Sequence, residues 1–328
     1  MTANSLPIVH TSERSAINRC VQQWWWRYRM GLVPKHRQAD ALWFGIGVHY
    51  ALAEWYLKGK RRGPHPADTF IAWAGDEIAY AKTYLGDGYD EPVWEDAREL
   101  GVAMLVAYVE HWGRDPQWQI ISVEQPFSVR VVRGGQPIAL FRSRWDGVFR
   151  DLSDGQIYLL ETKTASQVTT AYLELDNQAG SYWAVAGAIL KNKGILKPGE
   201  EIAGIQYNFL RKAKPDQRPR NDQGQYLNKD GSVSLKQPPP LFVRPSPIER
   251  SPKEQATQMN RLADEVAVMN AFRDGTLPIT KTPTRDCPRC DFWDMCKLHE
   301  RGGTAWESIA RSNYIQRDPY EEDRKVFG

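Results

Sequence analysis

The residues best suited to chemistry lie on two neighbouring predicted strands. Glu161 and Lys163 are two positions apart in a segment rich in β-forming residues, so their side chains leave the same face of a strand. Asp146 lies on the preceding predicted strand, one short turn away. Carboxylates bind Mg²⁺ through hard oxygen ligands, and a lysine can orient or deprotonate a water molecule. The spacing predicts a hydrolytic metal site that acts on a phosphate ester.

The Glu-x-Lys pattern is weakly specific by itself, because about one copy arises by chance in a chain of this size. A surface ion pair on a strand is its alternative interpretation. Three further features supply context: His49 four residues after Gly45, Gln178 and Tyr182 on one face of a helix, and Glu124 on the first strand. Taken singly, His49 is more often a core or surface histidine, and Tyr182 more often packs a helix.

In this order and spacing, the chain resembles the PD-(D/E)XK nuclease superfamily and, within it, the RecB-like branch. The matching motifs are Gly45-x-x-x-His49, Asp146, Glu161-Thr-Lys163 and Gln178-x-x-x-Tyr182. The resemblance covers residues 20–299. It implies an α/β fold with a restriction-endonuclease-like core, in which helices flank a mixed β-sheet.

The resemblance also implies roles for these residues. Asp146, Glu161 and the carbonyl of Thr162 would bind Mg²⁺ or Mn²⁺, with His49 as a further ligand. Lys163 would act on the nucleophilic water. Gln178 and Tyr182 would position DNA or support the site. Glu124 fits a strand residue found near such sites but belongs to no tight motif.

Four cysteines form a second candidate centre. Cys287, Cys290 and Cys296 are close together, and Cys20 precedes Cys287 by 267 positions. Four thiolates are the usual ligands of an iron–sulfur cluster. The pattern resembles the [4Fe–4S] clasp of the CRISPR-associated Cas-four nucleases, the AddB subunit and related phage exonucleases. Zinc, held by the three clustered cysteines and either Cys20 or His299, is the alternative.

Three consecutive tryptophans follow Cys20. Trp24, Trp25 and Trp26 adjoin Arg27 and Arg29, and aromatic stacking with arginine–phosphate pairing would suit single-stranded DNA. Core packing beside the cysteines is the alternative. Three successive residues of a helix cannot all face inward, so we expect at least one to be exposed or at an interface.

Composition excludes several classes of protein. The 328 residues are 41% hydrophobic and 25% charged, which is incompatible with a disordered or collagen-like chain. No apolar run approaches the roughly 20 residues of a membrane span, so we expect no membrane contact. Residues 1–10 lack the pattern of a secretory signal, and the expected location is the cytoplasm of a prokaryotic or phage-infected cell.

Positive charge is concentrated in one segment. Residues 211–253 contain ten Lys or Arg and four Asp or Glu, and are rich in Pro, Gln and Asn. We expect a long irregular insertion with a short hairpin around residues 228–231. It is either a solvated loop or a phosphate-binding segment. In the second case its DNA-binding residues would be Arg211, Lys212, Lys214, Arg218 and Arg220.

Hydrophobic periodicity predicts the elements that position these residues. We expect helices over 45–57, 92–112, 176–191 and 251–272, and strands over 119–132, 138–150, 156–163 and 202–211. The whole chain, 1–328, is expected to be one nuclease domain. Its parts are a helical N-terminal region (1–115), a catalytic core of αβββαβ order (116–212), the basic insertion (213–252), and a helix with the cysteine-bearing tail (253–328).

The sequence thus predicts a metal-dependent DNA nuclease, an exonuclease on single strands or DNA ends. Its expected partner is DNA, with recombination, replication or CRISPR-adaptation proteins and an oligomer also compatible with the resemblance. A non-catalytic DNA-binding or assembly protein on the same fold is the main alternative. An iron–sulfur electron carrier is a weaker one, because no flavin or nicotinamide motif accompanies the cysteines.

Overall fold

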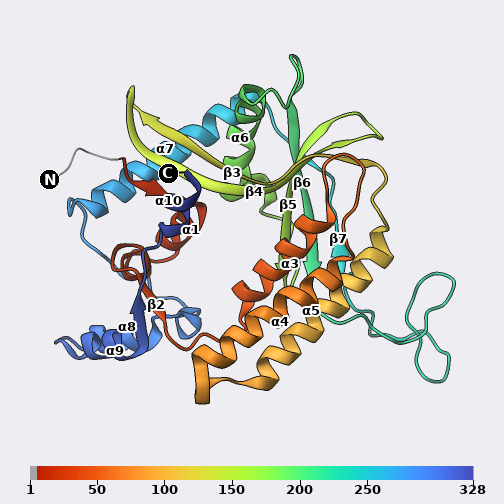
Figure 1. The fold of residues 1–328 in the computed structure, drawn as a ribbon, viewed down its shortest axis with the longest axis horizontal. Coiled ribbons are helices and arrows are strands. Elements are labelled where there is room, and N and C mark those ends of the chain that lie inside the picture. The colour runs from red at the N-terminus through yellow and green to blue at the C-terminus, as the bar shows by residue number, and fades with distance from the viewer. Residues whose placement is uncertain (1–5, 328) are drawn as a thin grey trace.

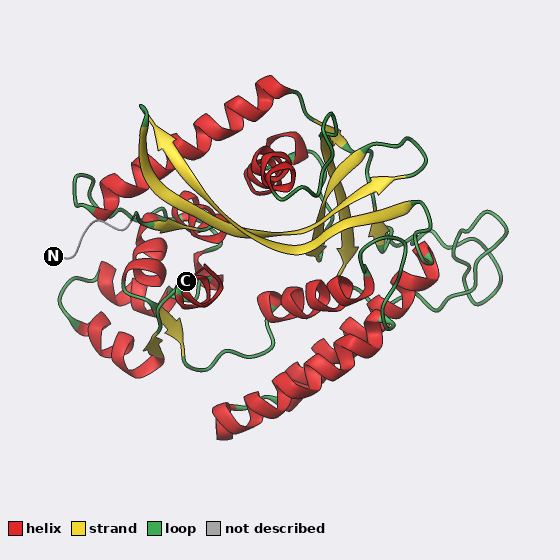
Figure 2. Cartoon of the chain, turned by 45° about the horizontal axis from the view of Figure 1, so that its top comes forward, coloured by secondary structure: helices red, strands yellow, loops and turns green. Residues whose placement is uncertain are grey.

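A mixed seven-stranded sheet occupies the centre of the computed structural model, which describes residues 6–327 (Figures 1 and 2). Its strand order is β1-β4-β5-β6-β7, with β3 also paired to β4 and β8 to β6. The strands are β1 (Ile8–Val9), β3 (Trp118–Arg133), β4 (Gln136–Asp151), β5 (Ile157–Ala165), β6 (Ile202–Arg211), β7 (Phe242–Val243) and β8 (Ile248–Glu249).

The sheet combines a long antiparallel hairpin with a parallel pair. β3 and β4 are joined by Gly134 and Gly135, both with positive φ, as a tight hairpin turn requires. β4 and β5 are antiparallel, whereas β5 and β6 are parallel and connected through α6 (Asn177–Asn192). β6 is buried along nearly its whole length, as expected for a strand covered on both faces.

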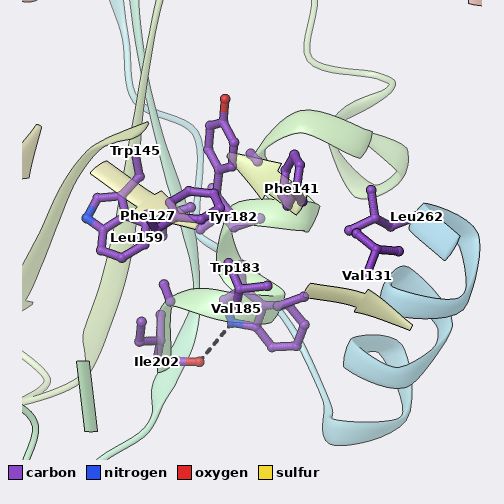
Figure 3. Packing of buried hydrophobic residues seen from close by; sticks show 14 of the residues in the cluster. Phe127, Val131, Phe141, Trp145, Leu159, Tyr182, Trp183, Val185, Ile202 and Leu262 are labelled. Atoms are coloured by element: carbon purple, nitrogen blue, oxygen red, sulfur yellow. Dashed lines mark hydrogen bonds between the residues drawn. The ribbon is translucent and has the colours of Figure 1, made fainter. Parts of the chain in front are cut away.

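Helices cover both faces of the sheet (Figure 2). On one face, α6 and α7 (Pro252–Arg273) pack with the hairpin, and the indole of Trp183 donates a hydrogen bond to the carbonyl of Ile202 (Figure 3). On the other face lie α3 (Ala41–Trp55), α4 (Pro66–Leu85) and α5 (Glu91–Trp112). Alternate residues of β5 therefore face different helices: Ile157 and Leu159 contact the first group, Tyr158 and Leu160 the second.

A smaller lobe joins the two ends of the described chain. β2 (Leu32–Pro34) pairs antiparallel with β9 (Tyr314–Gln316), and Gly31 has a φ of +66° where the carbonyl of Arg317 would collide with any Cβ. The lobe's helical elements are α1 (Thr11–Arg19), α2 (Val21–Trp24), a π-helical turn (Trp25–Arg29), a 3₁₀ turn (Cys287–Arg289), α8 (Trp293–Glu300), α9 (Ala305–Asn313) and α10 (Glu321–Phe327). Two other 3₁₀ turns, Gly86–Gly88 and Leu173–Leu175, lie elsewhere in the molecule.

The tryptophan run packs the core of this region. Trp24 and Trp26 are 0% and 2% exposed, and each belongs to a different cluster of buried hydrophobic residues. Trp25 is partly buried and packs against both clusters. The core-packing interpretation is therefore confirmed, and a base-stacking role for Trp24 and Trp26 is wrong. The π-helical turn that begins at Trp25 changes the angular spacing of the side chains, which lets neighbouring tryptophans enter different parts of the core.

The predicted central elements are present with small shifts of their ends. Asp40 caps α3 by accepting from the backbone N–H groups of Leu42 and Trp43, so this helix begins four residues earlier than predicted. Asp176 caps α6, and a capping box between Ser251 and Glu254 begins α7. The separate helix α4 was not predicted.

The mixed sheet flanked by helices confirms the coarse fold class. Residues 116–212 contain β3, β4, β5, α6 and β6 in that order, and the helix that precedes them, α5, ends at Trp112. Residues 1–5 and 328, which the expected domain ranges include, lie outside the described residues. Among residues 6–327, no helix combines the length and apolarity needed to cross a membrane.

Candidate metal centre

Asp146 lies where two strands of the sheet separate. The β4–β5 ladder ends at the pair Gly147 and Leu160. One position further, the Asp146 carboxylate takes the place of a backbone partner, since its Oδ2 accepts a hydrogen bond of 2.6 Å from the N–H of Thr162. A side chain rather than a carbonyl therefore closes the ladder, and it fixes the orientation of Asp146.

A β-bulge determines which residue of β3 faces Asp146. The hairpin pairs Val132 with Pro137, then shifts register by one residue near Val131. After the shift, Val123 faces Gly147 and Gln125 faces Trp145, so Glu124 lies opposite Asp146. A regular ladder from the same turn would have placed Glu124 opposite Trp145. Since a one-residue shift exchanges the two faces of a strand, the bulge brings the two carboxylates together.

The helix α3 supplies the third donor. Nδ1 of His49 lies 3.1 Å from Oδ1 of Asp146. His49, Glu124 and Asp146 each offer a ligand atom within 4.8 Å of the others, and within residues 6–327 they are the only such group of three or more His, Cys, Asp or Glu side chains. One nitrogen and two carboxylate donors at this separation suit a divalent cation.

The pKa shifts in this group reflect negative charge gathered in one place. Burial and the nearby Asp146 carboxylate raise the pKa of Glu124 to about 7. Burial would lower the pKa of His49, but the contact with Asp146 outweighs it and raises this pKa to about 9. Either shift stabilises a proton where a metal cation would otherwise neutralise the carboxylates.

Glu161 is a buried carboxylate with one oxygen unpaired. Its side chain is 2% exposed, and Oε1 lies 2.6 Å from Nζ of Lys163. Oε2 is buried without a hydrogen-bond partner. Burial raises the pKa of Glu161 against the opposing effect of Lys163. An unsatisfied buried oxygen of this kind costs free energy, and a metal ion would supply the missing partner, so the donor set fits a divalent cation.

Lys163 connects the carboxylates to helix α6. Its Nζ donates to Oε1 of Gln178 at 3.0 Å and lies 3.9 Å from Oδ2 of Asp176. Burial lowers the pKa of Lys163, but Glu161 and Asp176 raise it by more. The lysine is therefore held as a cation, by three oxygens, on the α6 side of the sheet.

Tyr182 and Thr162 make the outer contacts of the centre. The Tyr182 hydroxyl lies 2.8 Å from that of Ser143, and burial raises the pKa of Tyr182 to about 12. Behind β5, the Thr162 hydroxyl accepts from Asn208, which also donates to the hydroxyl of Tyr108. The contacts of Asn208 join β5 to β6 and α5.

The four cysteines converge on one cavity of about 40 Å³, although Cys20 is so remote in sequence. His299, the other candidate for fourth ligand, does not line it. Burial raises the pKa of Cys290 and of Cys296, and the backbone N–H of Thr284 donates to Sγ of Cys287.

The spacing of the thiols bears on the ligand. Zn–S bonds of about 2.3 Å in a tetrahedron place the sulfurs about 3.8 Å apart. Within residues 6–327, no three cysteine sulfurs lie within 4.8 Å of one another. No three of the four described thiols are therefore as close together as the ligands of a closed zinc site would be.

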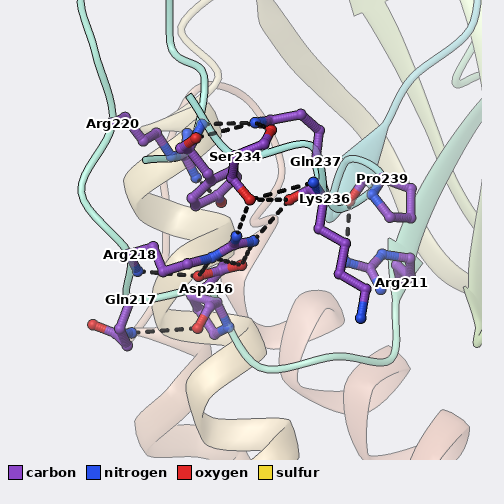
Figure 4. Close-up of polar contacts among 11 residues, drawn as sticks. Arg211, Asp216, Gln217, Arg218, Arg220, Ser234, Lys236, Gln237 and Pro239 are labelled. Carbon is purple, nitrogen blue, oxygen red and sulfur yellow. Dashed lines mark hydrogen bonds and ion pairs between the residues drawn. The ribbon is translucent and has the colours of Figure 1, made fainter. Parts of the chain in front are cut away.

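Arg218 is held by contacts within the basic insertion (Figure 4). Arg218 donates to the Asp216 carboxylate, the Ser234 hydroxyl and the Lys236 carbonyl. The hydrogen bonds from Arg218 hold the pKa of Asp216 at about 2. The predicted turn at residues 228–231 is present, since the Gly231 N–H donates to the Asn228 carbonyl.

The other predicted DNA-binding residues are similarly engaged. Arg211 donates to the carbonyls of Pro239 and Pro240, Lys214 lies 2.8 Å from Glu99, Arg220 stacks on Tyr226 and Lys212 lies over the ring of Phe44. The segment is thus built mainly as a folded loop.

The structure brings the predicted residues His49, Asp146, Glu161, Thr162, Lys163, Gln178 and Tyr182 into one centre. The sequence motifs do not assign Glu124 as a metal ligand, and they do not include Asp176 or Ser143. Asp176 both caps α6 and contacts Lys163, because the cap position faces Lys163 across the β5–α6 connection.

Comparison with known proteins agrees with this geometry. The family model of the PD-(D/E)XK nuclease superfamily matches residues 11–297. The matched range contains all the residues of the candidate metal centre and all four cysteines, but not α9, β9 or α10. The comparison with curated proteins found no match.

Proposed function

Because the chain belongs to the PD-(D/E)XK nuclease superfamily, we propose that it is a metal-dependent deoxyribonuclease that degrades single strands or DNA from its ends. The observation that carries this proposal is the convergence of His49, Glu124 and Asp146 beside the unpaired oxygen of Glu161. A scaffold that only bound DNA would gain nothing from burying four ionisable groups so close together.

Asp146 and Glu161 would hold Mg²⁺ or Mn²⁺, with His49, the Thr162 carbonyl and Glu124 as the remaining protein donors. The bound cation would stabilise charge on the phosphate and lower the pKa of a coordinated water. Asp146 is oriented for this by the Thr162 N–H, and Glu161 by Lys163.

Lys163 would orient and activate the attacking water. Its ammonium already donates to Glu161 and Gln178, so it is fixed in position before a substrate arrives. Gln178 and Tyr182 lie on one face of α6 and line the same cavity, where they would position the scissile strand.

A cleavage assay tests the proposal. End-labelled linear single- and double-stranded DNA and a closed circle would each be incubated with Mn²⁺, Mg²⁺ or EDTA. We expect degradation of linear DNA only, abolished by EDTA, and a loss of at least about 10³-fold in the Glu161→Ala and Lys163→Ala variants.

Glu201→Ala is the matched control, because Glu201 is an exposed carboxylate remote from the centre. It should cleave like the wild type. Intact DNA after incubation of the wild type with both metals would overturn the nuclease assignment. Cleavage of the closed circle would contradict the exonuclease assignment, while the nuclease assignment would stand.

We also propose that Cys20, Cys287, Cys290 and Cys296 hold a [4Fe–4S] cluster. The convergence of four cysteines supports this proposal, and the absence among residues 6–327 of three sulfurs within 4.8 Å of one another supports a cluster over zinc. Anaerobically purified protein should contain iron and labile sulfide and show visible absorbance. Stoichiometric zinc without iron would refute the cluster.

A further inference from the structure

A cavity of about 620 Å³ adjoins the candidate metal centre. Gln178, Tyr182 and Ser143, which all contact or support the centre, form part of its wall. The opposite wall comes from α1, the π-helical turn and residues 317–327. The cavity therefore begins at the proposed catalytic residues and extends toward the small lobe.

Four arginines line this cavity: Arg27, Arg142, Arg144 and Arg317. Their ionic contacts with acidic side chains are long or absent. Arg27 lies 3.5 Å from Asp291 and Arg144 lies 3.6 Å from Glu124, whereas no side-chain ion pair is found for Arg142 or Arg317 within residues 6–327. The insertion arginines differ, because their guanidinium groups are consumed by carboxylate and carbonyl oxygens.

An acidic helix forms part of the cavity lining. α10, which lies beside α1 in Figure 1, brings Glu321, Glu322 and Asp323 to the cavity lining. Asp323 lies 2.5 Å from Nε2 of His10. Arg142 lies over the ring of Phe327 at 4.8 Å. Carboxylates of α10 and four arginines thus line the same cavity.

The attachment of α10 to the protein is slight. None of its residues is buried. The residue before it, Tyr320, packs on His10 at 5.2 Å and is enclosed by Glu13 and Arg273, and this burial raises its pKa. The segment consequently has a firm anchor at Tyr320 and a loosely held helix after it.

We propose that this cavity binds the sugar–phosphate backbone of a single strand on its way to the metal centre, and that α10 is an acidic lid which the strand displaces. The carboxylates of the lid would compete with phosphates for the positive potential of the cavity, although within residues 6–327 none of them is ion-paired with the four arginines. The cavity has the size of a site that encloses a small ligand, which suits a few nucleotides of single strand.

This inference rests on the proposed nuclease function for its substrate, but the residues that its tests change, Arg27, Arg317, Asp323 and Phe327, are not among the proposed metal ligands. The lid also lies beyond residue 297, outside the range of the family match. It is therefore a property of this chain rather than one implied by the superfamily.

Binding of a labelled single-stranded oligonucleotide, measured by fluorescence anisotropy over a range of salt, tests the cavity. The Lys163→Ala background prevents cleavage. Adding Arg27→Gln with Arg317→Gln should weaken binding and make the log–log salt slope shallower by about 1.4, because each phosphate contact on a single strand contributes about 0.7. Arg61→Gln with Arg301→Gln, two exposed arginines remote from the cavity, should leave the slope unchanged.

The lid is tested by Asp323→Asn and, separately, Phe327→Ala. Each should tighten binding by about threefold or more, since the competing closed state becomes less populated. Glu201→Gln, which removes an equal charge elsewhere, should not. Unchanged affinity in both lid variants would overturn the lid.

The outcomes separate this inference from the nuclease assignment. If the wild type cleaves DNA and the double arginine variant binds the oligonucleotide as before, the nuclease assignment stands and the cavity is not the binding site. If the wild type does not cleave DNA but the double arginine variant loses binding, the cavity is the binding site and the nuclease assignment is refuted.

Discussion

Glu124 has a φ of +43°, in the left-handed region that favours glycine. A glutamate in this region costs on the order of 1–3 kcal/mol, and such strain concentrates at functional sites. The residue also buries a carboxylate against Asp146. The fold tolerates two destabilising features at one position, which is the behaviour expected of a metal ligand in metal-free protein.

Comparing Glu124→Gly with Glu124→Ala separates the strain from the charge. Both changes should lower metal-dependent cleavage by about 10²-fold or more, because both remove the donor. The glycine variant should be at least as stable to urea as the alanine variant, by up to about 1 kcal/mol, since only glycine adopts this φ without strain.

In a regular strand the alanine variant would be the more stable of the two, because glycine is destabilising there by about 0.5–1 kcal/mol relative to alanine. An alanine variant more stable than the glycine variant would show that the backbone at Glu124 is unstrained. Full cleavage activity in either variant would remove Glu124 from the metal ligands.

At the scale of elements, one buried network ties the basic insertion to the rest of the protein. Arg244, just after β7, lies 2.6 Å from Asp115, with the two side chains 7% and 1% exposed. Its guanidinium lies 3.9 Å from the ring centroids of both Trp112 and Trp118. It also donates to Asn208, so the network reaches β6.

Arg244→Met should therefore destabilise the protein by about 3–5 kcal/mol, because it leaves the Asp115 carboxylate buried without its cation. The double variant Arg244→Met with Asp115→Asn should recover part of this loss. Urea unfolding measures both. A single variant within 1 kcal/mol of wild type would show that water replaces the guanidinium and that the network does not hold the insertion.

Local patterns were sufficient to predict the strands and helices that carry the centre. Alternation predicted β3 and β4, and hydrophobic periodicity predicted α6 and α7. The bulge near Val131 could not be predicted, because alternation within one strand does not specify its register with the next strand. Glu124 belongs to no tight motif, and only the register after the bulge places it opposite Asp146.

Long-range pairing explains the remaining differences. The basic insertion was given even weight as a phosphate-binding segment because charge is visible in a sequence and its internal partners are not. Arg218 finds Ser234 across a 16-residue separation that no periodicity describes. Likewise, α10 has a short acidic sequence typical of a solvated tail, and only the fold places it over a basic cavity.

At the scale of the whole molecule, the small lobe joins segments from both ends of the chain. Cys20 lines one cavity with three cysteines that follow it by 267 positions and more, and the β2–β9 ladder lies in the same lobe. A ligand bridging such a large loop stabilises the fold mainly by restricting the unfolded chain, by about 5 kcal/mol from loop-closure entropy.

Cys20→Ser should therefore lower the free energy of unfolding by up to about 5 kcal/mol in protein reconstituted with iron and sulfide. In metal-free protein the same change should cost less than about 0.5 kcal/mol, because serine replaces a half-buried thiol without closing any loop. Equal losses in both states would show that Cys20 stabilises the lobe by packing alone.

The β2–β9 ladder has a consequence for synthesis of the protein. At 5–20 residues per second, the ribosome needs on the order of 15–60 s to travel from Leu32 to its strand partner Gln316. In the last part of this interval the nascent chain carries strands β3 to β6 complete but lacks the segment that pairs with β2. A translation product that ends before Tyr314 therefore leaves β2 without its partner strand and lacks α10.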